Sequence, residues 1–474
     1  MHRTALCLAS LVVFSAAALA GDEPKLPRPV RLRRDCCLDR QPLPELNVRA
    51  GQRFLLTDEG APFFYLGDTA WELFHRLGRE DTTRYLEDRA AKGFTVIQAV
   101  VLAEFAGLTE PNADGHLPLR NSDPLKPNDL YFQHVDWVVK EAAELGLRIG
   151  MLPTWGDKWN KKWGQGPEIF TPENAAAYGE WLGNRYKEQP IIWILGGDRP
   201  VENERHKEIL RALAAGLKKG DGGKHPITFH PMGGHSSSEW LHDEKWLDFN
   251  MLQSGHGARD IANYQMIARD YARKPPKPCL DGEACYEDHP INWKPENGWF
   301  DDYDVRKTAY WSVFAGACGH TYGCHDIWQF LSDARPPVSS ARTPWRKALG
   351  FPGSSQVGYL RKLIESRPFF HRVPDQSLIA GDTLKGTDHI QACRGDDGSY
   401  AFVYSASGKQ FTVDLSKLTC ERLHTWWFDP RTGAATDAGD LARDGKKDFT
   451  PPSSGRGNDW VLVLDDAARK YNMP

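Results

Sequence analysis

Short apolar segments alternate with helical segments along most of this chain, and this alternation restricts the fold more than any other feature. The apolar segments lie at 63–67, 94–102, 148–153, 191–195, 227–230, 249–252, 278–280 and 320–322. Segments with helical spacing follow them at 81–92, 131–145, 172–187, 202–219, 260–273, 304–316 and 356–365. Only the helix after the fifth apolar segment is poorly marked. Eight strand-and-helix units predict an α/β fold, a closed (β/α)₈ TIM barrel over residues 51–370.

An open, doubly wound sheet is the alternative arrangement of such units. A sheet of that kind that binds a dinucleotide has a Gly-x-Gly-x-x-Gly turn after its first strand. This chain has Leu66-Gly67-Asp68-Thr69 at that point. The sequence therefore favours the closed barrel.

The apolar pattern changes after about Pro374, where every second residue becomes apolar. Runs with this period lie at 377–380, 389–394, 399–404, 410–414, 422–428 and 460–464. Turn sequences separate them, for example Asp396-Asp397-Gly398. We expect a small C-terminal β-sandwich over residues 375–474.

The N-terminus has the pattern of a signal peptide. Arg3 precedes an apolar run from Ala5 to Ala20, which ends in Ala18-Leu19-Ala20. We predict a signal peptide at residues 1–20 and hence a secreted or periplasmic protein. The run is short for a bilayer and no second run follows, so we expect no membrane span. Residues 21–50 are rich in proline, and we expect an extended leader there.

Composition and motifs restrict the partners. The net charge is −4 and no long basic face is present, so nucleic acid is not an expected partner. The sequence lacks a Cys-x-x-Cys zinc spacing, a His-Glu-x-x-His motif and a His-x-His after the first strand, so we expect no metal and no other cofactor. A Gly-x-Ser-x-Gly serine hydrolase motif is also missing. The pattern of disulfides and the oligomeric state stay open.

Polar and aromatic side chains follow most of the predicted strands, at the end where a (β/α)₈ barrel places its active site. Taken singly, such an Asp often caps the next helix, and such a Trp or His usually packs in the core. Taken together, they form the ring of carboxylates, imidazoles and indoles that a sugar-binding cleft needs. We therefore predict contact with a carbohydrate substrate for Asp68, Trp71, Gln98, Trp155, Asp157, Arg199, His230, His256, Tyr286, Glu287, His325 and Trp328.

Two carboxylates occupy the positions that glycosidic bond cleavage requires. One carboxylic acid must protonate the leaving oxygen, and one carboxylate must attack the sugar or activate water. Asp198 follows the fourth apolar segment after two glycines, and Glu283 follows the seventh. We predict Asp198 as the general acid/base and Glu283 as the nucleophile of a retaining enzyme, whose carboxyl groups lie about 5–5.5 Å apart.

Other side chains are assigned to supporting roles. Glu287 is the main alternative for the nucleophile, and Asp281 is the next. We expect His230, His256 and Asp68 to hold the sugar next to the cleaved bond. Trp155 and Trp328 are expected to form stacking walls, and Arg199 or His325 is expected to adjust the ionisation of the carboxylates.

Four stretches of the barrel carry a resemblance to a known family. They are Phe54 to Trp71, Gly196-Gly197-Asp198, Asp281-Gly282-Glu283 with Tyr286-Glu287, and Gly319 to Gly323. In these stretches the chain resembles the apiosidase-like glycoside hydrolase family 140. That family is part of the large group of (β/α)₈ glycosidases whose acid/base follows strand four and whose nucleophile follows strand seven. Most of this group has Asn-Glu after strand four, whereas Gly197-Asp198 is the pattern of the resembled family.

The resemblance implies a secreted glycoside hydrolase that acts on plant-type polysaccharides, including apiose-containing pectic side chains. The family's C-terminal module is similar in position to the predicted sandwich, and such modules are named for proposed collagen binding. Residues 375–474 show no pattern that would explain collagen binding. The alternative is a non-catalytic carbohydrate- or matrix-binding protein on a barrel scaffold.

Overall fold

The computed structural model describes residues 42–474. The predicted signal peptide and residues 21–41 of the expected leader lie outside this range. The last residues of the leader segment contain the short strand Leu46–Asn47 (β1). This strand pairs antiparallel with Leu55–Thr57 (β2), which pairs in turn with Pro62–Phe63 (β3), so a small three-stranded sheet precedes the barrel.

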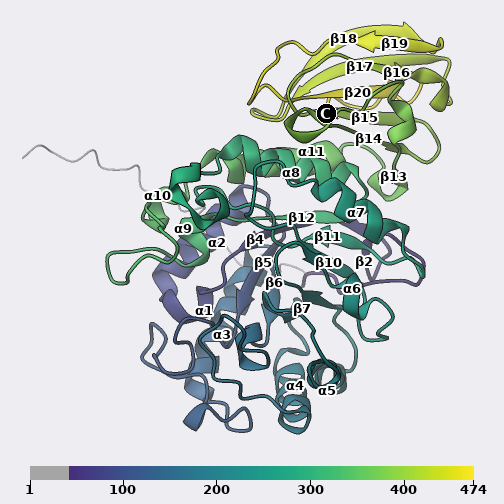
Figure 1. Cartoon of the computed structure of the whole chain (residues 1–474). Coiled ribbons are helices and arrows are strands. Elements are labelled where there is room, and N and C mark those ends of the chain that lie inside the picture. The colour runs from purple at the N-terminus through teal and green to yellow at the C-terminus, as the bar shows by residue number, and fades with distance from the viewer. Residues whose placement is uncertain (1–41) are drawn as a thin grey trace, which may run out of the picture. The chain divides into compact units, whose positions relative to one another are not determined.

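Eight parallel strands form the barrel, which confirms the predicted fold class (Figure 1). They overlap the eight predicted segments: Tyr65–Thr69 (β4), Val96–Val100 (β5), Arg148–Leu152 (β6), Ile191–Gly196 (β7), Ile227–His230 (β8), Asn250–Gln253 (β10), Cys279–Asp281 (β11) and Gly319–Tyr322 (β12). All their residues are buried, which is why a strand such as β7 is a continuous apolar run rather than an alternating one.

The barrel closes between β8 and β10. The hydrogen-bonded ladder runs from β8 through β4 and β12 to β10, whose other neighbour is the short antiparallel strand His235–Ser236 (β9). Between the two ends, the hydroxyl of Thr228 donates to the carbonyl of Phe249 at 2.7 Å. The amide of Asp248 donates to the carbonyl of Ile227 at 2.8 Å. In the described residues, β8 and β10 do not pair as neighbouring strands. These two hydrogen bonds join β8 to the residues just before β10.

Helices surround the barrel in the order that the sequence predicts. The long ones are Arg79–Ala91 (α2), Asp129–Glu144 (α3), Pro172–Tyr186 (α4), Glu204–Asp221 (α5), Asn263–Ala272 (α7), Asp302–Phe314 (α8) and Pro352–Glu365 (α11). Single turns are Leu73–Arg76 (α1), Ser238–Leu241 (α6), His325–Trp328 (α9) and Trp345–Ala348 (α10). The poorly marked helix after the fifth strand is the single turn α6. None of the helices in residues 42–474 is long and apolar enough to cross a membrane.

Local signals explain where these helices begin and end. Thr171 and Asn174 form a capping box at the start of α4, and Pro172 occupies its first turn. Asn203 caps α5 by accepting from the amide of His206. Gly222 ends α5 in the left-handed conformation, with φ 73°.

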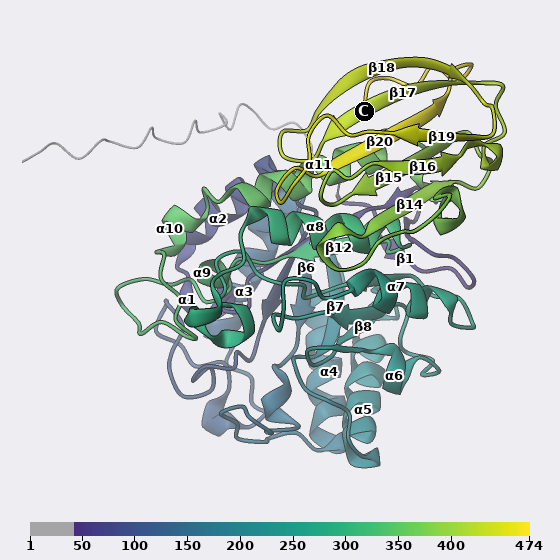
Figure 2. The same ribbon diagram turned by 45° about the horizontal axis from the view of Figure 1, so that its top comes forward.

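The C-terminal domain is a β-sandwich of two antiparallel sheets, as predicted (Figure 2). The larger sheet contains Arg372–Pro374 (β13), Ile390–Gly395 (β14), Tyr400–Ser405 (β15), Trp460–Asp466 (β20), Arg422–Asp429 (β17) and Ala434–Ala442 (β18). Phe411–Asp414 (β16) and Lys446–Phe449 (β19) form the second. The strand predicted at 377–380 is wrong, because Gln376–Leu378 is a 3-10 helix and Ile379 makes only an isolated bridge to Val413.

Helix α8 belongs to the core of both domains. Every residue from Tyr303 to Phe314 is buried. The ring of Phe314 stacks on Phe402 of β15 at 5.8 Å, and Tyr310 stacks on Tyr404 at 4.8 Å. A helix that is covered on all sides needs no polar face.

Two buried ion pairs join the barrel helices to the sandwich. Arg306 of α8 donates to Asp459 at 2.9 and 2.6 Å. Arg367, just after α11, donates to Asp465 at 2.8 and 2.7 Å. All four side chains are nearly inaccessible to solvent. Each guanidinium binds both oxygens of its carboxylate, which is the strong form of this contact.

Candidate active site

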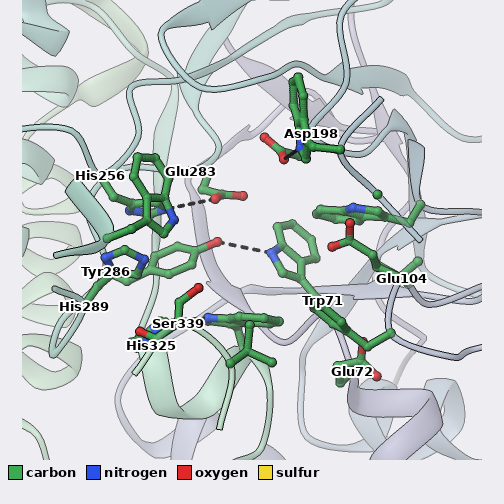
Figure 3. A pocket seen from close by; sticks show the side chains of 18 of the residues that line it. Trp71, Glu72, Glu104, Asp198, His256, Glu283, Tyr286, His289, His325 and Ser339 are labelled. Carbon is green, nitrogen blue, oxygen red and sulfur yellow. Dashed lines mark hydrogen bonds and ion pairs between the residues drawn. The ribbon is translucent and has the colours of Figure 1, made fainter. Parts of the chain in front are cut away.

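A cavity of about 480 Å³ opens at the carboxyl ends of the barrel strands. Its walls come from the segments that end or follow β4, β5, β6, β7, β10, β11 and β12 (Figure 3). The lining residues are Trp71, Glu72, Val100, Glu104, Phe105, Trp155, Trp163, Gly164, Gln165, Asp198, Gln253, His256, Glu283, Tyr286, His289, Trp293, His325, Trp328, Val338 and Ser339.

The cavity brings together both predicted catalytic carboxyls and half of the predicted substrate contacts. Figure 3 shows Asp198 and Glu283 directed toward the same open space. The predicted contacts that line it are Trp71, Trp155, His256, Tyr286, His325 and Trp328. The cavity therefore lies at the rim of the barrel, at the strand ends from which these contacts were predicted.

A glycine turn carries Asp198 into the cavity. Gly196, Gly197 and Asp198 all have positive φ, at 94°, 104° and 54°. A Cβ at Gly196 would lie 2.4 Å from the carbonyl oxygen of His230, and one at Gly197 would lie 2.7 Å from the amide of Gly156. Only glycine fits both positions without displacement of the backbone. The two glycines therefore let β7 end in a sharp turn that exposes the next side chain.

One carboxyl oxygen of Asp198 is held by the protein. Its Oδ2 accepts from the indole Nε1 of Trp163 and from Nη1 of Arg199, each at 3.1 Å. No hydrogen bond from residues 42–474 reaches Oδ1. Burial and the neighbouring Glu283 raise the pKa of Asp198 above its ordinary value, against the opposing effects of Arg199 and His230. A proton on Oδ1 is thereby both favoured and accessible.

Glu283 is held by three side chains. Its Oε1 accepts from Nε2 of Gln253 and lies 3.0 Å from Nε2 of His256. Its Oε2 lies 3.1 Å from Nε2 of His230. Burial alone would raise the pKa of Glu283, but the contacts with His230 and His256 outweigh it and lower the pKa to about 2. Glu283 is therefore an ionised and oriented carboxylate.

His230 lies between the backbone of Asp198 and the carboxylate of Glu283. Its Nδ1 accepts from the backbone amide of Asp198 at 3.3 Å. Because Nδ1 is the acceptor, the proton of a neutral ring is on Nε2, which faces Glu283. The ring also packs against Trp71, with centroids 5.3 Å apart. His230 does not line the cavity, and its polar contacts are with the carboxylate of Glu283 and the backbone amide of Asp198.

Four further residues that we expected to contact substrate face away from the cavity. Asp68 is fully buried and accepts from Tyr85 and Arg89 at 2.5 and 2.6 Å. Gln98 bridges Tyr65 and the carbonyl of Gly282 inside the barrel, at 3.0 Å each. For Asp68 and Gln98 the expected sugar contact is wrong, because each points into the barrel or toward its helices, where protein groups satisfy it.

Asp157 and Glu287 are corrected for the same reason. Asp157 is fully buried and pairs with Lys158 at 2.7 Å. Glu287 accepts from the hydroxyl of Tyr322 at 2.6 Å and from the amide of Gly353 at 3.3 Å. Burial raises the pKa of Glu287 to about 7 despite these donors. Neither side chain lines the cavity.

The alternatives for the nucleophile are thus less well placed than Glu283. Glu287 is turned toward α11, and Asp281 accepts from Ser254 and Asn263 at 2.6 and 3.1 Å inside the structure. Only Glu283 of these three lines the cavity.

Arg199 has one of the two roles that we predicted for it. It does not line the cavity, but its fully buried guanidinium donates to the carbonyl and to Oδ2 of Asp198, at 2.8 and 3.1 Å. Arg199 therefore contacts the carboxyl group of Asp198 from outside the cavity wall. His325, the other candidate for adjusting ionisation, lies on the opposite wall and contacts Ser339 and Trp328 instead.

Aromatic rings form much of the cavity wall. Trp71 packs on Trp155 at 5.2 Å, and Trp328 packs on Phe105 at 5.8 Å. Trp163 and Trp293 were missed by sequence reasoning, and they are 55% and 53% exposed. Trp163 lies in a loop and Trp293 ends the short 3-10 helix Ile291–Trp293, where no periodic pattern predicts the direction of a side chain. Exposed flat rings at a cavity are suited to stacking on sugar faces.

Several polar residues of the cavity were also missed. Glu72 and Glu104 follow β4 and β5 directly, so their position after a strand was an available signal. Glu72 is held by His75 and Arg76, at 2.9 and 3.2 Å. Its pKa is lowered, because these partners outweigh the effect of burial.

Three histidines pack in a row that begins at Glu283, the first two rings stacked and the last two edge to face. The rings of His256 and His289 lie 4.4 Å apart, and His289 and His325 lie 4.3 Å apart. Burial lowers the pKa of His289, and it lowers the pKa of His325 to about 4. In residues 42–474, no group of three or more His, Cys, Asp or Glu side chains is arranged to hold a metal ion.

The arrangement is suited to acid- and nucleophile-assisted cleavage of an acetal bond. A carboxyl whose pKa is raised and a carboxylate whose pKa is lowered face one cavity, and their different surroundings shift the two pKa values in opposite directions. Aromatic walls supply the surfaces on which sugar rings stack.

Comparisons with known proteins agree with this geometry. Residues 49–371 match the model of a family described as the apiosidase-like catalytic domain. Residues 373–465 match a family named for proposed collagen binding in a collagenase. No curated protein matches the chain.

Two solved structures are similar over nearly the whole chain. One, described as a glycoside hydrolase, is 35% identical, with a TM-score of 0.83, and the match covers 90% of this chain and 98% of that one. The other is described as a glycoside hydrolase family 5 protein from Bacteroides vulgatus. It is 34% identical, with a TM-score of 0.84, and the match covers 90% of this chain and 94% of that one.

Proposed function

Since the chain belongs to the apiosidase-like family and is a glycoside hydrolase, we propose that it is a retaining enzyme with Asp198 as general acid/base and Glu283 as nucleophile. The observation that carries the proposal is the opposite direction of the pKa shifts of these two carboxyls in one cavity. The pKa of Asp198 is raised by burial and by Glu283, while histidine contacts lower the pKa of Glu283 to about 2. A retaining glycosidase needs this combination before the bond breaks.

The reaction proceeds in two displacements. Asp198 gives its proton to the glycosidic oxygen as the bond to the leaving group breaks, and Glu283 forms a bond to the anomeric carbon. Asp198, now ionised, then takes a proton from water. The oxygen of that water attacks the anomeric carbon and releases Glu283. Both carboxyls return to their starting states, and the product keeps its anomeric configuration.

We further propose a plant-type polysaccharide as the substrate, including apiose-containing pectic side chains. Membership of the apiosidase-like family supports this class. The exposed rings of Trp163 and Trp293 support a polymer, because each offers a further surface for a sugar. Secretion is part of the proposal and rests on the predicted signal peptide at residues 1–20.

Amide substitutions test the two catalytic roles. Asp198→Asn and Glu283→Gln each keep the size of the side chain and remove its acid–base or nucleophilic function. Release of reducing sugar from a panel of plant polysaccharides should fall by orders of magnitude in both variants, with an unchanged circular dichroism spectrum. Glu80→Gln is the matched control, since the side chain of Glu80 is 92% exposed.

Two outcomes would contradict the proposal. Near-normal hydrolysis by Asp198→Asn or Glu283→Gln would remove that residue from the mechanism. Binding of the polysaccharides by the wild-type chain without any turnover would favour the non-catalytic alternative.

A further inference from the structure

Two carboxyl groups of the cavity share one buried guanidinium. Nη1 of Arg199 donates to Oδ2 of Asp198 at 3.1 Å, and Nη2 donates to Oε1 of Glu104 at 2.8 Å. Arg199 is fully buried, while the side chain of Glu104 is 19% exposed and lines the cavity. Figure 3 shows Glu104 and Asp198 on the same side of the cavity, opposite His256 and Tyr286.

We propose that Glu104 is a positioning residue that keeps the catalytic proton on Asp198, because it binds and balances the charge of Arg199. This inference rests on the proposed role of Asp198 as general acid/base. Without Glu104, the full charge of a buried guanidinium would act on Asp198 alone. An adjacent cation favours the ionised form of a carboxyl, so Asp198 would lose its proton at a lower pH.

The neighbours of Asp198, Arg199 and Glu104 support a positioning role for Glu104. Asp198 faces Arg199, Glu283 and His230. Glu104 faces Arg199, Asp157 and Asp198. Asp157 is already neutralised by Lys158, whose Nζ lies 2.7 and 2.9 Å from its two oxygens. Among the described carboxylates, Arg199 therefore has two direct partners, Asp198 and Glu104.

Trp163 strengthens the coupling by covering the guanidinium. Its ring lies over Arg199 with the centroid 4.8 Å away, and its Nε1 donates to Asp198 at 3.1 Å. Because the ring keeps water away from Arg199, the effective dielectric constant is lower there and the charges of Arg199 and its carboxyl partners interact more strongly. A negative charge on Glu104 thus raises the cost of a second negative charge on Asp198.

The titration of Glu104 is linked to that of Asp198. Burial raises the pKa of Glu104 to about 7, with smaller contributions from Asp157 and Asp198, although Arg199 opposes the change. Two carboxyls that interact in this way titrate as a coupled pair. Loss of a proton from Glu104 then makes the loss of the proton from Asp198 more difficult.

The fall of kcat/KM with rising pH, which is the alkaline limb of the pH profile, tests the proposal. In Glu104→Gln, we expect this limb to move to lower pH by roughly one unit, because Asp198 ionises earlier. Glu104→Ala should move it in the same direction. Glu104→Asp keeps the negative charge, and its limb should lie closer to that of the wild type. A purely structural role for Glu104 would lower activity without moving the limb.

Glu72→Gln is the control, because Glu72 lines the same cavity but pairs with His75 and Arg76 and not with Arg199. The alkaline limb of Glu72→Gln should lie at the same pH as that of the wild type, even where its kcat/KM is lower. An unmoved limb in both Glu104→Gln and Glu104→Ala, or an equal shift in Glu72→Gln, would overturn the proposal.

A measurement without substrate separates this inference from the proposed function. In protein labelled with ¹³C at the aspartate carboxyls, the resonance of Asp198 is the one that Asp198→Asn removes. Its titration midpoint should fall in Glu104→Gln relative to wild type. A midpoint that falls while Asp198→Asn stays active would support the coupling and reject the catalytic role of Asp198. An unchanged midpoint would reject the coupling itself.

Discussion

Asp198 and Glu283 carry the same functional group, and their neighbours shift the pKa values of the two carboxyls in opposite directions. Asp198 has a buried environment with a second carboxylate nearby, which raises its pKa. Glu283 has two imidazole contacts and an amide donor, and its pKa is lowered. The roles of acid and nucleophile therefore follow from the surroundings of each side chain and not from its type.

The pH profile of kcat/KM should reflect both pKa shifts. The reaction needs Asp198 protonated and Glu283 ionised, so activity falls as pH rises through the raised pKa of Asp198. It also falls as pH drops toward about 2, the pKa of Glu283. His256→Phe keeps the ring but removes the donor to Glu283, so its acid limb should move to higher pH. An acid limb that does not respond to this substitution would contradict the assignment of Glu283.

Trp163 should contribute on the leaving-group side of the bond. It donates to Asp198, and the acid acts on the leaving oxygen, so the exposed ring lies where the departing sugar binds. Trp163→Ala should raise KM for polysaccharide roughly tenfold, whereas Trp163→Phe keeps a flat ring and should raise it less. A glycosyl fluoride has no leaving sugar, and its KM should be unaffected. Equal losses on both substrates would place Trp163 elsewhere in the mechanism.

At the scale of elements, the turn after β7 places the acid. Gly197→Ala should lower both stability and activity, because its φ is 104° and a Cβ would contact the ring of Trp155 at 3.0 Å. The strain of a positive φ costs about 1–2 kcal/mol. Gly223→Ala is the control, since its φ is 76° but a Cβ would have no neighbour within 4 Å. Thermal unfolding should respond to both substitutions, and turnover only to Gly197→Ala. Full activity of Gly197→Ala would contradict this account of the turn.

Most elements of the barrel could be predicted from the sequence, because strands such as β7 are continuous apolar runs and helices such as α3 and α5 have amphipathic spacing. The strands β18 and β19 could not, since most of their side chains are exposed and no apolar run marks them. The position of a residue just after a strand predicted that it lies at the rim of the barrel. It did not predict which of these side chains point into the cavity. Asp68 and Trp71 are three residues apart, yet Asp68 pairs with Arg89 behind the barrel wall while Trp71 lines the cavity.

At the scale of the whole molecule, the described barrel and sandwich share buried polar contacts through α8. Asp459→Ala would leave Arg306 buried without its bidentate partner. We expect a loss of about 3–5 kcal/mol in the free energy of unfolding. Calorimetry should show one transition at a lower temperature. Asp444→Ala, on an exposed turn, is the control. Separate transitions, of which only one moves, would show that the two domains unfold independently.

The central claim is that Glu283 attacks the sugar and forms a covalent intermediate. A 2-deoxy-2-fluoro glycoside of the sugar released from the polysaccharide panel should slow the second displacement more than the first and trap that intermediate. Digestion and fragmentation of the labelled peptide by tandem mass spectrometry should then place one label on Glu283 itself, and Glu283→Gln should carry none. A label on Glu72, Glu104 or Glu287, or turnover to an inverted product without any label, would contradict the account.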